Sequence, residues 1–191
     1  MINYWKFSRD PYFARRVADR LLASGMIVSD NKPDHLYQRT ASSLSAQWQL
    51  ESKTDADATA LLKTYEKEIA AGAVDSRKMF TMIKKKLVQD RRLVLLSDPT
   101  LSDEDKLSHL AHLIQKGILT DPDLDLTGTP ESLLHEIKKI LTAEVEMEME
   151  ILKIVETRLS HSKHLEGSDE WNLLYKRTFD ELMKKRGYRA A

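Results

Sequence analysis

The chain has 191 residues and no net charge at pH 7, with 41% hydrophobic and 31% charged residues. This composition indicates a globular protein, and the small numbers of Gly (6) and Pro (5) favour long helices. The absence of cysteine excludes disulfides, thiol nucleophiles and thiolate metal sites. No apolar run is long enough to span a membrane, and we find no secretory signal, so we expect a cytoplasmic protein.

The charge is divided unevenly along the chain. Residues 1–95 carry 17 Lys and Arg against 11 Asp and Glu, which gives a net charge of +6. Residues 96–191 carry 13 against 19, which gives −6. The asymmetry reflects either solvated helix faces or attraction between the halves, within one chain or head-to-tail between chains.

The first half of the chain predicts a short helix, a long helix and a basic final helix. Gly25 ends the short helix, because glycine tolerates the left-handed conformation common at helix ends. The middle of the long helix, ESKTDADAT, is weakly apolar, so we expect exposure or a break there, whereas Leu61 and Tyr65 are expected to face the core. The final helix begins at a cap formed by Asp75 or Ser76. The predicted ranges are about 11–25, 34–71 and 75–94.

The second half predicts the same order after a joint at LSDPT (residues 96–100). Ser102, Thr129 and Ser168 are predicted caps of three helices, and Gly117 is predicted to end the first of them. The segment AEVEMEMEI alternates like a strand, but its long helical context favours a helix that spreads its glutamates around the surface. The long helix is predicted from Pro130 to about residue 162.

An internal repeat explains this order of elements. VADRLLASGMIV (residues 17–28) resembles HLAHLIQKGILT (residues 109–120), 92 positions later, with Gly25 over Gly117. The sequence therefore predicts an all-α protein of two tandem, related three-helix units, each with a long central helix. The predicted units are residues 1–96, which are basic and divergent, and residues 102–188, which are acidic.

Three stretches of the second half carry a family resemblance: LSHLAHLIQKGIL (107–119), LLHEIKKIL (133–141) and GSDEWNLLYKRTFDELMKKRG (167–187). They resemble the bacterial family named domain of unknown function 507, over roughly residues 102–188. The first half matches more loosely, with Ser76 where Trp171 would fall and Phe80 where Tyr175 would. The resemblance implies a helical fold, a bacterial source and the two-copy layout of the family's larger members. It implies no catalytic residue, cofactor or substrate.

No catalytic motif or cofactor site is predicted, because the chain lacks a phosphate-binding glycine loop and a nucleophile elbow. The histidines of two pairs, His109 with His112 and His161 with His164, lie three residues apart on predicted helices. Polar surface roles are favoured for them over metal ligation, so no metal site is predicted.

Two clusters are candidate interaction sites. The basic cluster of the third helix comprises Lys84, Lys85, Lys86, Arg91 and Arg92, and it reads either as a solvated helix face or as an anion-binding surface. The aromatic pair Trp171 and Tyr175 reads either as core packing or as a protein-binding surface.

The function favoured by the sequence is that of a non-catalytic protein that binds other proteins, including a second copy of itself in a homo-oligomer. The charge asymmetry and the long helices with two apolar seams motivate this hypothesis. The alternative is a nucleic-acid or ribosome-associated protein that uses the basic helix around Lys84–Lys86.

Overall fold

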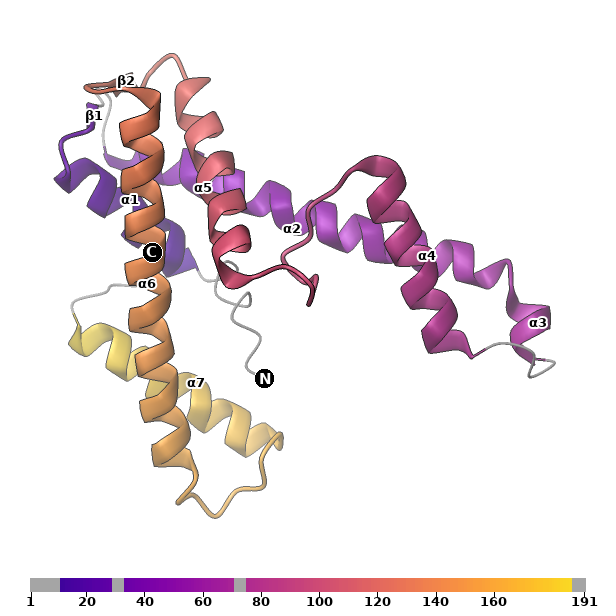
Figure 1. Cartoon of the computed structure of the whole chain (residues 1–191). Coiled ribbons are helices and arrows are strands. Elements are labelled where there is room, and N and C mark those ends of the chain that lie inside the picture. Colours follow the sequence, from indigo (N-terminus) through magenta and orange to yellow (C-terminus); the bar gives the residue numbers. More distant parts are fainter. Residues whose placement is uncertain (1–10, 29–32, 71–74, 187–191) are drawn as a thin grey trace.

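The computed structural model describes residues 11–28, 33–70 and 75–186 (Figure 1). Its helices are α1 (Pro11–Ala23), α2 (Pro33–Lys63), α3 (Glu66–Ala70), α4 (Ser76–Arg91), α5 (Asp103–Leu119), α6 (Pro130–Leu159) and α7 (Asp169–Lys185). Strands β1 (Ile27–Val28) and β2 (Asp125–Leu126) form a short antiparallel pair, with Ile27 opposite Leu126. The all-α fold class is thereby confirmed.

Four helices form the centre of the molecule. α1 packs against α2 and α6, and α5 packs against the same two long helices. Beyond this centre the long helices project as two arms (Figure 1). The second half of α2 carries α4, and the second half of α6 carries α7, so we refer to the α2–α4 arm and the α6–α7 arm.

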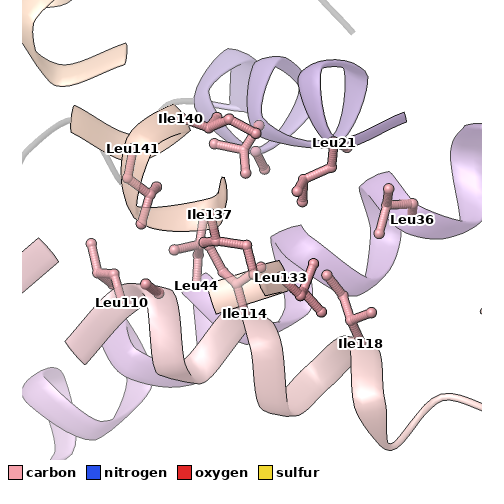
Figure 2. Close-up of a cluster of buried hydrophobic side chains, with 14 of the residues drawn as sticks. Leu21, Leu36, Leu44, Leu110, Ile114, Ile118, Leu133, Ile137, Ile140 and Leu141 are labelled. Carbon is pink, nitrogen blue, oxygen red and sulfur yellow. The ribbon is translucent and has the colours of Figure 1, made fainter. Parts of the chain in front are cut away.

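One hydrophobic cluster joins both halves of the chain (Figure 2). Leu21 and Leu36, from α1 and α2, pack in the same cluster as Ile114 and Ile137, from α5 and α6. Complete burial of one such side chain stabilises the fold by about 1.5–3 kcal/mol. Both predicted units contribute to this core, and their division into separate domains stays a prediction.

Buried positions repeat along the chain at a constant spacing of 97 residues. The counterparts are Phe13 and Leu110, Val17 and Ile114, Leu21 and Ile118, Leu36 and Leu133, and Leu44 and Leu141. The prolines that begin the long helices, Pro33 and Pro130, have the same spacing. The repeat spacing of 92 residues, predicted from the sequence, is therefore wrong. It aligned Gly25 with Gly117, and these two glycines have different roles.

Gly25 follows α1 with a φ of 71°, as expected for a residue at a helix end. Gly117, by contrast, lies inside α5, so the prediction that it ends the helix is wrong. A Cβ atom at Gly117 would collide with the hydroxyl oxygen of Ser43, which donates a hydrogen bond to the carbonyl of Arg39 at 3.0 Å. Glycine is favoured here because α5 and α2 approach closely, which no local pattern shows.

We predict that Gly117→Ala destabilises the fold by about 1–2 kcal/mol, because overpacking against Ser43 outweighs the better helix propensity of alanine. In a Ser43→Ala background, which removes the colliding oxygen, the same substitution is expected to be neutral or stabilising. Urea unfolding of the four proteins in this cycle measures the difference. Equal effects of Gly117→Ala in both backgrounds would contradict the packing role.

Of the two outcomes expected for ESKTDADAT, the break is wrong, because α2 is continuous across it, whereas exposure is confirmed for Ser52, Lys53, Ala56 and Thr59. Thr54 and Ala58 are buried there, where α4 packs on α2, so tertiary contact supports a segment with a weak apolar pattern. Leu61 and Tyr65 were expected in the core but are 43% and 40% exposed. The helical pattern pauses at Thr64–Tyr65 and resumes in α3, and the predicted end at residue 71 lies outside the described residues.

The predicted helix starts are confirmed by hydrogen bonds at the caps. The side chains of Asp75, Ser102 and Ser168 each accept a hydrogen bond from the backbone N–H three residues later. Thr129 forms a reciprocal capping box with Ser132. The alternating segment AEVEMEMEI is helical, within α6, as its context predicted.

Candidate interaction site

Helix α4 packs on α2 without burying any of its own residues completely. It begins after the Asp75 cap and ends at Arg91, and the cap residue Arg92 that follows has a left-handed φ of 53°. Residues 76–92 contain seven Lys and Arg and a single acidic residue, Asp90, which gives +6. This one segment therefore has the same net charge as the whole of residues 1–95.

The predicted basic cluster is divided between two faces of the α2–α4 arm. Lys84 Nζ lies 2.6 Å from Asp55 Oδ1, and Arg91 Nη1 lies 2.5 Å from Asp57 Oδ2. These two cations tie α4 to α2. Lys85, Lys86 and Arg92 are exposed, as are Arg77 and Lys78.

An apolar side chain lies among the exposed cations. Met82 is 67% exposed and is four residues, about one helical turn, after Lys78 and before Lys86. Methionine adapts its shape to a partner and is common on protein-binding surfaces. The exposed side chains of this surface are those of Arg77, Lys78, Met82, Lys85, Lys86 and Arg92, and we call it the α4 face.

The second predicted candidate, Trp171 and Tyr175, packs between α7 and α6. The rings stack with their centroids 5.1 Å apart and pack on a cluster that includes Ile151 and Met183. Burial raises the pKa of the Tyr175 hydroxyl, and the negative charges of nearby glutamates add to the effect. Both residues thus contribute to the stability of the α6–α7 arm, and their role in binding a partner stays a prediction.

The prediction that the glutamates of AEVEMEMEI lie around the surface is wrong for Glu144 and Glu148, which are 0% and 1% exposed. Arg16 of α1 donates hydrogen bonds to both carboxylates, with its Nη2 lying 2.8 Å from Glu148. Arg20 Nε also pairs with Glu144, at 2.6 Å. The sequence does contain a signal, because both glutamates fall on the same helical seam as buried Ile137 and Ile151.

The corresponding positions of α2, 97 residues earlier, are Gln47 and Glu51, and both are also buried. The Glu51 carboxylate accepts hydrogen bonds from the backbone N–H groups of Leu96, at 2.8 Å, and Ser97, at 3.3 Å. Gln47 donates to the Val94 carbonyl at 2.8 Å. Each long helix thus uses this pair of positions to hold a neighbouring segment.

The histidine pairs do not form a shared site among the described residues. His109 is bonded to the side-chain oxygen of Gln47 at 3.1 Å, and His112, His161 and His164 are exposed. Desolvation lowers the pKa of His109, and the charge of His112 lowers it further while Glu51 opposes the shift. His109 is therefore part of the α5–α2 contact.

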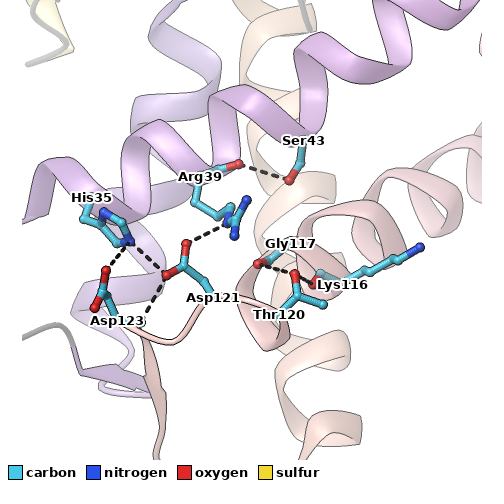
Figure 3. Close-up of polar contacts among 8 residues, drawn as sticks. All are labelled: His35, Arg39, Ser43, Lys116, Gly117, Thr120, Asp121 and Asp123. Atoms are coloured by element: carbon cyan, nitrogen blue, oxygen red, sulfur yellow. Dashed lines mark hydrogen bonds and ion pairs between the residues drawn. The ribbon is translucent and has the colours of Figure 1, made fainter.

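A different group of potential metal ligands, His35, Asp121 and Asp123, lies between α2 and the turn before β2 (Figure 3). His35 Nε2 lies 3.0 Å from Asp121 and 3.9 Å from Asp123. Arg39 Nε lies 2.7 Å from the other oxygen of Asp121, so a guanidinium already balances the buried carboxylate. We interpret this cluster as a polar link between the two halves, which sequence reasoning missed because its residues are far apart in the chain.

The described residues therefore form an all-α protein with a four-helix centre and two helical arms. The model of the DUF507 family, described as a protein of unknown function, matches residues 6–188, so the chain belongs to this family. The match includes the first half, beyond the resemblance over 102–188. No curated protein matches the chain. None of the described helices has the length and apolar character needed to cross a bilayer.

We predict that Asp121→Asn destabilises the protein by about 1–3 kcal/mol at pH 7, because it removes a buried, charge-assisted link. The hydrogen bond from His35 is the main cause that lowers the pKa of Asp121 below 3.8. The carboxylate therefore stabilises the fold above that pH, and its contribution is lost as the pH falls through the lowered pKa. Urea unfolding between pH 7 and pH 3 measures this, with the difference from wild type shrinking in acid. Asp123→Asn, at an exposed partner, is the matched control, and an equal effect would contradict the prediction.

Arg16→Met is expected to cost about 3–5 kcal/mol, because it leaves Glu144 and Glu148 buried without their main partner. The triple variant Arg16→Met/Glu144→Leu/Glu148→Leu should recover most of this loss, since no buried charge remains. Urea unfolding at pH 7 compares the variants. Arg15→Met, which removes partly exposed ion pairs, should cost less than about 1 kcal/mol. A triple variant as unstable as the single one would contradict this account.

Proposed function

We propose that this protein is a non-catalytic module that binds other proteins through the α4 face. The observation that carries the proposal is the combination of exposed cations and exposed Met82 on a helix none of whose residues is completely buried. Among the described residues no carboxylate forms an ion pair with Arg77, Lys78, Lys85, Lys86 or Arg92. Such a surface suits a partner that is acidic and partly apolar.

The contacts that the buried polar groups make within the chain also support a non-catalytic role. Arg16 joins α1 to α6, Glu51 holds the joint before α5, and Asp121 links to α2. Each is engaged by groups of the chain itself, so the polar residues with the most unusual environments are accounted for by packing of the fold. The α4 face is exposed and takes no part in these contacts.

Affinity capture from a lysate of the source organism tests the proposal. The wild-type protein is compared with Lys85→Glu/Lys86→Glu, after nuclease treatment of the lysate, by quantitative mass spectrometry. Reversal of two exposed charges on the α4 face is expected to reduce capture of the partner by about tenfold or more. The matched control, Lys184→Glu/Lys185→Glu, reverses an exposed lysine pair on α7. Equal capture by all three proteins would contradict the role of the α4 face.

A second candidate function is binding of nucleic acid, which the five exposed cations of the α4 face favour. Phosphate contacts by these cations would make the affinity fall steeply with salt. Filter binding to RNA and to duplex DNA over a salt series tests this candidate. Lys85→Glu/Lys86→Glu should reduce the salt slope by about two if both lysines contact phosphates. We place protein binding first because Met82, at the centre of the face, has no role in a phosphate contact.

A further inference from the structure

The negative charge of the second half falls in its first 49 residues, a longer stretch than the 17 residues that carry the positive charge of α4. Residues 96–144 contain ten Asp and Glu and four Lys and Arg, whereas residues 145–191 contain nine of each. The whole net charge of −6 therefore falls within α5, β2, the first half of α6 and the segments that join them. This charge is equal in size to that of α4 and opposite in sign.

Part of this acidic surface lies at the β1–β2 end of the molecule. Asp123, Asp125 and Glu131 are exposed there, and the apolar side chains of Val28 and Leu119 are 49% and 46% exposed. We call this group of residues the acidic end. Like the α4 face, it combines charge of one sign with exposed apolar side chains.

The two surfaces are too far apart to meet within one chain. Near its start, α2 contacts the acidic end, where His35 lies 3.9 Å from Asp123. Further along, α2 contacts α4, where Asp55 pairs with Lys84. At a rise of 1.5 Å per residue these two points of one continuous helix are about 30 Å apart. Figure 1 shows the β1–β2 pair and α4 at opposite ends of α2.

We propose that the partner of the α4 face is the acidic end of a second copy of this chain. This inference rests on the proposed function and names its partner. Opposite charges bring the surfaces together, and the apolar side chains on both sides give the contact area that charge alone does not supply. Because the two surfaces differ, the contact is head-to-tail. Each copy can bind one neighbour through its α4 face and another through its acidic end.

The association is weak and salt-sensitive, because the charges are exposed. Electrostatic attraction between such surfaces extends about 30 Å at 0.01 M salt and only about 3 Å at 1 M. Sedimentation velocity of the full-length protein is expected to show species heavier than a monomer at the low salt concentration, increasing with protein concentration. At the high salt concentration the monomer should predominate. A monomer under both conditions would overturn the proposal.

Charge reversal on each surface separately tests the pairing. Lys85→Glu/Lys86→Glu lowers the charge of the α4 face from +5 to +1, and Asp125→Lys/Glu131→Lys changes the charge of the acidic end from −3 to +1. Each variant alone should sediment as a monomer at low salt. An equimolar mixture of the two should associate again as pairs, since the intact α4 face of the second variant then meets the intact acidic end of the first. The chain carrying all four substitutions has no acidic surface left for the contact and should stay monomeric, and recovery in the mixture shows that the single-surface variants were folded.

The control Lys184→Glu/Lys185→Glu should associate like wild type. Association of either single-surface variant alone, or failure of the mixture to recover, would overturn head-to-tail pairing. If pairing fails while affinity capture still depends on Lys85 and Lys86, the α4 face binds a different protein and the proposed function stands. If both experiments fail, the proposed function fails as well.

Discussion

Two helices of 31 and 30 residues, α2 and α6, are too long for the core that they share. Each extends for about 45 Å, whereas the contacts with α1 and α5 occupy one part of that length. The remaining part must be covered by another element, and α4 and α7 do this. The shape of the molecule, with a centre and two arms, follows from this single constraint of helix length.

The two arms meet this constraint in different ways. At matching positions of the long helices, α6 has Ile151 and Val155 where α2 has Thr54 and Ala58. The α6–α7 arm consequently has its own hydrophobic cluster, including Trp171, whereas α4 is tied to α2 partly by ion pairs. An arm with little apolar core contributes less to stability, so we look to its outer surface for a role in binding.

Buried polar groups define how the halves fit together. Glu148 and Glu51 occupy matching positions of α6 and α2, and each is satisfied by a segment distant in sequence. Buried ion pairs add little net stability, because desolvation of the charges offsets their attraction. We interpret them as devices that favour one register of packing, since a shifted helix would leave a buried carboxylate without a partner.

Local chemistry determined much of this protein from sequence alone. Caps such as Ser102 and Thr129, and the apolar spacing of α6, predicted the helices correctly because these signals act within a few residues. Tertiary structure alone decided that Gly117 is a point of close approach, that Leu61 is exposed, and that Arg16 faces Glu144. These features depend on which surfaces meet across some hundred residues of chain, and neither helix propensity nor local spacing carries that information.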